Sequence, residues 1–185
     1  MKRIFIAIKI EPANTFLRIN SSLKAIPGNE KINWVDPENI HLTLAFPGDT
    51  EEDRIKVAAI MLKQQCSGFG EFDFNLSGTG VFKDFIDPRV IWIGIKESEK
   101  LAELYGKIKT GLEDTGFKTE NKPFRPHITI GRIKSLRNPG ELRSAVEKYK
   151  DSGIQKVNVK EVILYESILK PTGPVYKPIG IFKLI

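Results

Sequence analysis

The sequence predicts an α+β fold of two lobes, each a mainly antiparallel sheet with flanking helices, within one domain of residues 1–185. Two observations support this prediction. The phrase His41–Leu44 recurs 86 residues later (41 to 127) as His127–Ile130, and the two phrases hold the only two histidines of the chain. Five elements, in the order strand, helix, histidine strand, helix, strand, also occur twice at offsets of 85–87 residues. We interpret the chain as an internal duplication with halves at about 1–86 and 87–185.

The first half begins with a strand over residues 4–10, in which isoleucines alternate with other residues. A helix follows from Pro12 to about Lys24, because a proline suits a first helical turn and the apolar residues keep a helical spacing. Pro27-Gly28 ends this helix, and residues 29–39 read as a loop. The apolar residues that carry these assignments are Ile4, Ile6, Ile8, Phe16, Ile19 and Leu23, and Trp34 and Val35 anchor the loop to the core.

The histidine strand of the first half starts at His41, and Pro47-Gly48 is predicted to break it. Thr50 followed by Asp53 resembles a capping box that opens the next helix, which ends near Gly68. A short strand over 72–76 then alternates apolar with polar residues. The turn that follows it is marked by Gly78 and Gly80.

The second half repeats this order. A strand runs from Arg89 to Lys96, and Ser98 caps a helix that reaches about Thr115. The histidine strand at His127 comes next, and Asn138-Pro139 starts the last helix by the cap-then-proline rule. Two further strands close the chain, over residues 157–165 and 175–184.

The repeated phrase displays a histidine and a threonine on the same side of a strand. Successive side chains of a strand point to opposite faces, so His41 and Thr43 share one face and His127 and Thr129 repeat the arrangement. Leucine or isoleucine occupies the other face and anchors each strand to a core. A single histidine is most often structural, but two in matched frames favour a shared function.

Two facing imidazoles form the minimum set for in-line displacement at phosphorus. Because histidine titrates near neutrality, one ring can act as a base while the other, protonated, acts as an acid. Thr43 and Thr129 would donate hydrogen bonds to the non-bridging phosphate oxygens. Such a site needs no metal or other cofactor, and we find no convincing set of metal ligands around His41 or His127.

The residue five positions after each histidine differs between the halves: Phe46 in the first and Arg132 in the second. A phenyl ring and a guanidinium can both stack on a nucleobase, which makes the two residues candidates for substrate binding. An odd offset puts them on the face opposite the histidine unless a bulge near Pro47 or Gly131 turns them. For Phe46, packing in the core is an equally good interpretation.

Composition limits the function classes further. Lysine and arginine outnumber acidic residues by 29 to 23, a net charge of +6 that suits a polyanion such as RNA, although the basic residues are scattered. The lone Cys66 excludes an intramolecular disulfide and a four-thiolate metal site. No apolar stretch is long enough for a membrane span, and no secretory signal is recognisable. We therefore expect a monomeric cytoplasmic protein that does not associate with membranes.

The residues resemble the two-histidine phosphoesterase superfamily, and within it the RNA 2′,3′-cyclic phosphodiesterase family formerly called 2′-5′ RNA ligases. The resemblance covers nearly the whole chain and is specific because both histidine phrases occur at this spacing. The matching segments are Arg3–Ile8, Trp34-Val35, Asn39–Leu44, Pro88–Trp92, Pro123–Arg132 and Leu164–Ser167. Pro47 departs from the pattern, since many relatives carry an aliphatic residue there.

The resemblance implies antiparallel sheets, a choice that periodicity alone leaves open, and a central cleft across which the two motifs face each other. It also implies metal-independent hydrolysis of an RNA terminal 2′,3′-cyclic phosphate to a 2′-phosphate, with 2′-5′ ligation as the reverse reaction. His41 would protonate the leaving 3′ oxygen and His127 would activate water, and near symmetry leaves the exchange of these roles open. Phe46 and Arg132 would stack on the base.

Two other functions compete with this reading. A second enzymatic reading keeps the site but acts on a small cyclic phosphate or a 2′-5′ oligoadenylate. A third reading is a nucleotide- or RNA-binding module without catalysis. The presence of both histidines and both threonines favours an enzyme over the binding module.

Overall fold

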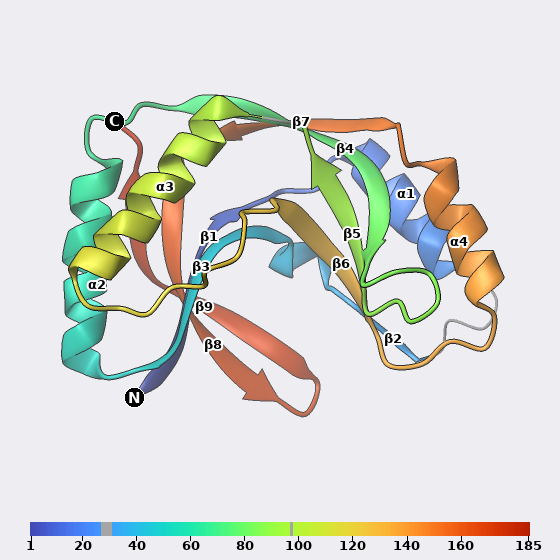
Figure 1. Ribbon diagram of the computed structural model, residues 1–185, viewed down its shortest axis with the longest axis horizontal. Helices are drawn as coiled ribbons and strands as arrows, with labels where there is room; N and C mark the ends of the chain where they lie inside the picture. The colour runs from blue at the N-terminus through green and yellow to red at the C-terminus, as the bar shows by residue number, and fades with distance from the viewer. Residues whose placement is uncertain (27–30, 97) are drawn as a thin grey trace.

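The computed structural model describes residues 1–26, 31–96 and 98–185, and within them four α-helices and a nine-stranded sheet (Figure 1). The helices are α1 (Asn14–Lys24), α2 (Glu52–Cys66), α3 (Glu99–Asp114) and α4 (Pro139–Lys148). The strands are β1 (Lys2–Lys9), β2 (Ile32–Trp34), β3 (His41–Thr50), β4 (Phe72–Phe82), β5 (Val90–Ile95), β6 (His127–Ile133), β7 (Gly153–Val159), β8 (Glu161–Lys170) and β9 (Gly173–Lys183).

The strands lie in the order β7-β4-β5-β6-β3-β1-β8-β9, with β2 paired to β6, and every pair is antiparallel. The predicted antiparallel α+β class is therefore confirmed. The two predicted sheets are joined into one, because Leu42 of β3 pairs with Ile128 of β6. This single residue pair between the two histidine strands is the only register that connects the two parts of the sheet among the described residues.

Each part of the sheet carries two helices and forms a lobe (Figure 1). The β1 lobe consists of β3, β1, β8 and β9 with α2 and α3, and the β5 lobe consists of β7, β4, β5, β6 and β2 with α1 and α4. Each lobe thus contains elements from both halves of the sequence: α3 packs beside α2, and α1 packs beside α4. The lobes in space do not coincide with the halves in sequence.

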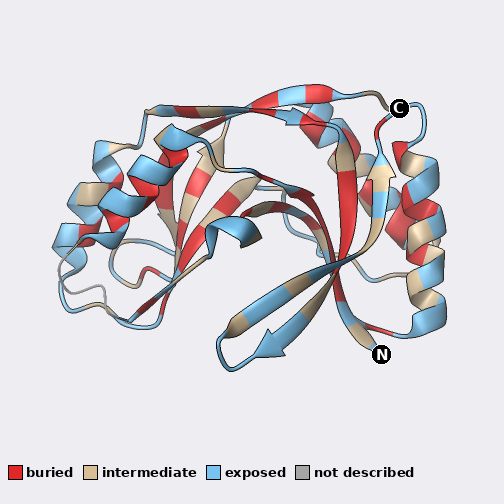
Figure 2. Cartoon of the chain, turned by 180° about the vertical axis from the view of Figure 1, so that it is seen from behind, coloured by how far each residue is buried: buried red, intermediate tan, exposed pale blue. Residues whose placement is uncertain are grey.

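The helix stripes seen in the sequence face the core. Phe16 and Leu23 of α1 and Leu104 and Ile108 of α3 are fully buried, and the buried residues of the helices lie on the sides that face the sheet (Figure 2). The predicted caps of α3 and α4 are confirmed: the Ser98 hydroxyl accepts a hydrogen bond from the Leu101 amide, and the Asn138 side chain accepts one from the Glu141 amide.

Several local predictions were wrong, because tertiary pairing overrides turn residues. Strand β3 continues through Pro47-Gly48 to Thr50, whose hydroxyl donates to the Gly48 carbonyl instead of capping α2. Strand β4 likewise runs through Gly78 and Gly80. The predicted strand over 157–165 is two strands that separate at Lys160, and β2 lies within the predicted loop. The predicted helix end at Pro27-Gly28 lies outside the described residues.

Gly78→Ala is expected to destabilise the fold by about 2 kcal/mol or more. Gly78 has φ +75°, and an added Cβ would collide with the backbone carbonyl of Lys150. Gly106→Ala is the matched control: Gly106 lies within α3 with no atom near its added Cβ, so this change should raise the free energy of unfolding by about 1 kcal/mol. Urea unfolding measures both, and equal stability of the two variants would contradict the close approach of Gly78 to the Lys150 backbone.

Candidate active site

The two histidines begin the two central strands, β3 and β6, side by side in the sheet. Extending the Leu42–Ile128 register by one residue in each direction sets His41 opposite Thr129 and Thr43 opposite His127. All four side chains then share the face opposite Leu42 and Ile128, both of which are buried in the core. One residue pair therefore brings together the four residues that the sequence singled out.

Each imidazole is held by the same backbone contact. Nδ1 of His41 lies 2.6 Å from the Asn39 carbonyl oxygen, and Nδ1 of His127 lies 2.7 Å from the Arg125 carbonyl oxygen. A carbonyl oxygen only accepts, so Nδ1 donates in both rings. Nε2 is thus the nitrogen that can take up or release a proton in each histidine.

The surroundings of the two rings differ. The centroid of the His41 ring lies 5.1 Å from that of Phe5 and 5.2 Å from that of Tyr176, and the Tyr176 contact is edge-to-face. The centroid of the His127 ring lies 4.7 Å from that of Phe82, also in an edge-to-face contact. Burial lowers the pKa of His41 from its ordinary value of 6.5, and the charges of Arg132 and His127 lower it further against the opposing effect of the Asn39 carbonyl. His41 is therefore biased toward the neutral imidazole in the unliganded protein.

Arg132→Gln is expected to raise the pKa of His41, because removal of a nearby positive charge favours the imidazolium. An NMR titration can follow this change cleanly, since the chain has only two histidines. The wild-type protein should show one ring titrating below 6.5. A His41 pKa at or above that value, unchanged in Arg132→Gln, would contradict the electrostatics described above.

Equivalent bulges turn Phe46 and Arg132 toward the histidine face. The pairing of β3 with β1 shifts by one residue at Leu44 and again between Ala45 and Gly48, and the pairing of β6 with β5 shifts by one residue at Ile130. The bulges at Leu44 and Ile130 each insert one extra residue three positions after the histidine, so the fifth position returns to the face of the histidine. The sequence left open whether a bulge turns these strands, and the structure contains one at each of these two positions.

Both residues are exposed and reachable by a ligand. Phe46 is 52% exposed, so the alternative that it packs in the core is wrong. Its ring lies beneath the guanidinium of Arg3, 5.1 Å from the ring centre. Arg132 is exposed and lines the same pocket as His41 and Phe46.

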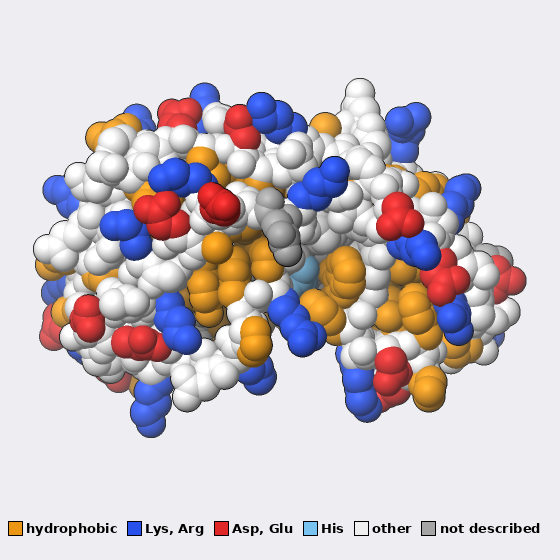
Figure 3. Space-filling model, turned by 45° about the horizontal axis from the view of Figure 1, so that its top comes forward, with side chains coloured by type: hydrophobic (Ala, Val, Ile, Leu, Met, Phe, Trp, Pro, Cys, Tyr) orange, Lys and Arg blue, Asp and Glu red, His pale blue; other side chains and the backbone are white. Residues whose placement is uncertain are grey.

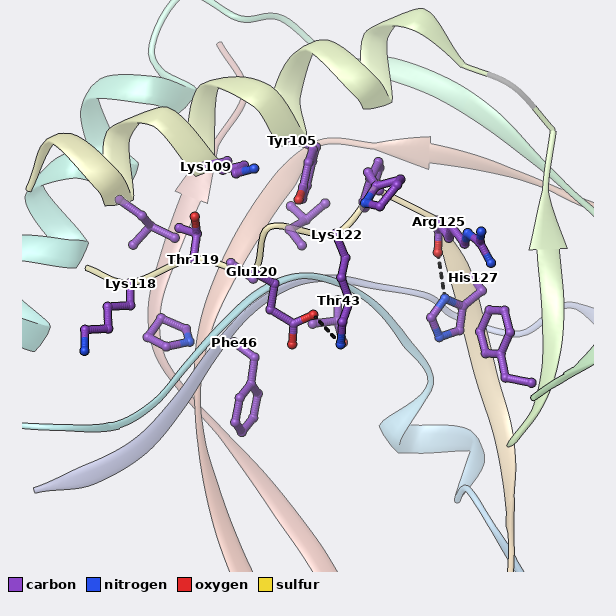
Figure 4. A pocket seen from close by; sticks show the side chains of 17 residues that line it. Thr43, Phe46, Tyr105, Lys109, Lys118, Thr119, Glu120, Lys122, Arg125 and His127 are labelled. Carbon is purple, nitrogen blue, oxygen red and sulfur yellow. Dashed lines mark hydrogen bonds and ion pairs between the residues drawn. The ribbon is translucent and has the colours of Figure 1, made fainter. Parts of the chain in front are cut away.

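Two adjoining cavities meet at this face. The hairpin pocket, about 420 Å³, is lined by His41, Thr43, Phe46 and Arg132 together with Arg3, Phe5, Ser167, Leu169, Pro174 and Tyr176. The α3 groove, about 920 Å³, lies between α3, the segment 118–125 and the start of β3, and includes Thr43, Phe46, Tyr105, Lys109, Lys122 and His127 (Figure 4). Thr43 and Phe46 line both cavities, whereas Thr129 lines neither. The two histidines thus open into different cavities that share a wall.

Several lining residues were not singled out as site residues from the sequence, although Ser167 lies in a segment that resembles the family. Ser167, Leu169 and Tyr176 come from the β8–β9 hairpin, which projects from the β1 lobe and has no copy in the repeat (Figure 1). Arg3 was named only as the first residue of the segment Arg3–Ile8 that resembles the family. Tyr105 and the lysines of the α3 groove looked like ordinary residues of a helix and its following loop. The segment Pro123–Pro126, which precedes the second histidine, was the feature of the sequence that could have indicated the α3 groove.

Other candidate chemistry is not supported by the described residues. Cys66 is buried, and burial raises its pKa to about 11, which keeps the thiol protonated. No group of three or more histidine, cysteine or acidic side chains there is arranged to hold a metal ion. None of the described helices is long and apolar enough to cross a membrane.

A two-lobed antiparallel α+β fold with one His-x-Thr motif on each central strand defines the class of two-histidine phosphoesterases. The chain belongs to the 2′-5′ RNA ligase superfamily, whose family model matches residues 33–168. It is 34% identical over 181 residues to the RNA 2′,3′-cyclic phosphodiesterase of Archaeoglobus fulgidus, covering 98% of this chain and 99% of that protein. The protein of the same name in Thermotoga maritima is 40% identical over 144 residues, covering 78% of this chain and 75% of that protein.

Solved structures show the same fold. The protein TT0787 of Thermus thermophilus superposes with a TM-score of 0.82 at 25% identity, covering 98% of this chain and 97% of that one. E. coli LigT in its apo form gives a TM-score of 0.73 at 24% identity, covering 98% of this chain and 96% of that one.

Proposed function

We propose that this protein is an RNA 2′,3′-cyclic phosphodiesterase that opens a terminal cyclic phosphate to a 2′-phosphate without a metal ion. The observation that carries the proposal is the matched pair of histidines, each with Nδ1 bound to a backbone carbonyl and Nε2 left for proton transfer. Two curated relatives of this name, at 34% and 40% identity, support the same reaction. Ends of RNA with a 2′,3′-cyclic phosphate are the proposed substrates.

In the proposed reaction, Nε2 of His127 removes a proton from water, whose oxygen attacks phosphorus in line with the 3′ oxygen. The bond between phosphorus and the 3′ oxygen breaks, and Nε2 of His41 donates its proton to that oxygen. The hydroxyls of Thr43 and Thr129 donate hydrogen bonds to the non-bridging oxygens as charge develops on them. The same geometry with a 5′-hydroxyl in place of water forms a 2′-5′ linkage without ATP.

The electrostatics of the free site bear on these roles. A lowered pKa of His41 favours the neutral form, which by itself suits a base better than an acid. A bound phosphodiester brings a negative charge that stabilises an imidazolium beside it. Because that charge acts on both rings, the assignment of His41 as the acid and His127 as the base follows the family resemblance.

The proposal is tested by incubating purified protein in excess EDTA with a 2′,3′-cyclic mononucleotide and, in parallel, with a 2′-5′ dinucleotide. We expect the first to be converted to the 2′-phosphate, identified by ³¹P NMR, with no requirement for added metal. The His41→Ala/His127→Ala double variant, purified in the same way, controls for contaminating nucleases. A 3′-phosphate product, or no product from either substrate, would contradict the proposal, and cleavage of the dinucleotide alone would favour the oligoadenylate reading.

Monomeric state and cytoplasmic location stay predictions of the sequence. Size-exclusion chromatography with light scattering tests the first, and cell fractionation tests the second.

A further inference from the structure

We infer that the α3 groove is a second binding site, which holds the nucleotides that precede the cyclic-phosphate end of a single-stranded RNA. This inference rests on the proposed function. The groove is about 920 Å³ against about 420 Å³ for the hairpin pocket, and both include Thr43 and Phe46. A strand whose terminal nucleoside occupies the hairpin pocket can therefore continue past these two residues into the groove.

The groove offers an aromatic surface on which bases can stack. The rings of Tyr105 and Phe124 stack on each other, with centroids 3.8 Å apart and an interplanar angle of 7°, so a base would stack on an outer face of this pair. Both side chains are half-buried and line the groove, with Tyr105 projecting from α3 (Figure 4). Aromatic platforms of this kind bind single-stranded nucleic acid with little preference for sequence.

The charge of the groove complements a phosphate backbone. Its described lining residues include four basic side chains and one acidic side chain, Glu120; the basic ones are Lys109, Lys118, Lys122 and Arg125. Figure 3 shows a hollow that is lined by hydrophobic side chains and contains a histidine, with lysine, arginine and some acidic side chains around it. The Lys122–Glu120 pair, 3.6 Å apart, is largely exposed and so restrains Lys122 weakly. Apolar walls with a cationic edge favour a nucleic-acid strand over an acidic protein, since stacking surface and charge occur together.

The inference predicts a preference for length. We expect kcat/KM for a short oligoribonucleotide with a 2′,3′-cyclic phosphate to exceed that for the matching cyclic mononucleotide by about tenfold or more, the gain of stacking one further base. The triple variant Lys109→Gln/Lys118→Gln/Lys122→Gln should lose most of this preference. It should also make the oligonucleotide reaction less sensitive to salt. The slope of log kcat/KM against log salt concentration should become shallower by about 0.7 for each phosphate that the lysines no longer neutralise.

The matched control is Lys63→Gln/Lys107→Gln/Lys160→Gln, which removes the same charge from exposed lysines that line neither cavity. Each oligonucleotide value is divided by the same variant's value on the mononucleotide, so that damage at the histidines cancels. A second pair separates stacking from charge: Tyr105→Ala should lose the preference and Tyr105→Phe should retain it.

The outcomes separate this inference from the proposed function. Equal kcat/KM for the two substrates in the wild-type protein, or equal preference in the groove and control variants, would overturn the groove assignment while hydrolysis of the mononucleotide stands. Failure of the wild-type protein on both substrates would instead reject the proposed function.

Discussion

His41→Ala and His127→Ala are each expected to lower kcat by about 10²–10⁴-fold, the usual loss when a general acid or base is removed. Each change deletes the only imidazole of its strand, and the two threonines that share the face are hydroxyl donors that cannot replace it as a general acid or base near neutral pH. Steady-state kinetics on a 2′,3′-cyclic nucleotide measure the loss. The double variant should be little worse than either single variant, because the two rings act as a unit.

A structural cause of that loss must be excluded. Both rings are only partly buried, so the alanine variants should keep the wild-type unfolding midpoint closely. Measurement of thermal unfolding checks this point. A folded His41→Ala or His127→Ala protein with wild-type kcat would remove that histidine from the mechanism.

Thr43→Val is expected to lower kcat by about 10²–10³-fold with a smaller change in KM, as when one donor to a developing oxyanion is removed. Valine keeps the shape and strand propensity of threonine, so the lost hydroxyl is the only chemical change. Thr43 is exposed and lines both cavities, whereas Thr129 is half-buried and lines neither. Thr129→Val should therefore have the smaller effect of the two.

The serine variants provide the control for this prediction. Thr43→Ser and Thr129→Ser keep the hydroxyl and should retain most of the activity. An equal loss in the valine and serine variants would show that packing, not the hydroxyl, accounts for the effect. Wild-type kcat in Thr43→Val would exclude its role as a donor.

The central residues of the site were predictable because strand alternation is a local rule. Once His41 and Thr43 lie on a strand, they share a face whatever the rest of the chain does. The helix stripes and the caps at Ser98 and Asn138 were predictable for the same reason. The bulges that turn Phe46 and Arg132 were not predicted: the odd offset showed only that each residue needs a bulge to reach the face of the histidine.

What the sequence did not reveal depends on contacts between distant segments. Gly78 and Gly80 indicate a turn when the local sequence is considered alone. In the structure, β4 pairs with both β5 and β7 and continues through the two glycines. The exchange of α1 and α3 between the lobes leaves no mark in a repeat that keeps the order of elements. Tyr176 contacts His41 only because β9 folds back along β8, and this hairpin has no second copy to draw attention to it.

The opposite roles of His41 and His127 are the central claim, and a change of leaving group tests them most directly. In a cyclic-phosphate analogue with sulfur in place of the bridging 3′ oxygen, the departing thiolate needs no proton, so the acid becomes dispensable while the base does not. If the sulfur analogue restored the activity of His127→Ala alone, His127 would be the acid and His41 the base. We predict that the sulfur analogue restores most of the activity of His41→Ala and none of that of His127→Ala, and equal deficits of both variants on both substrates would contradict an acid and base pair.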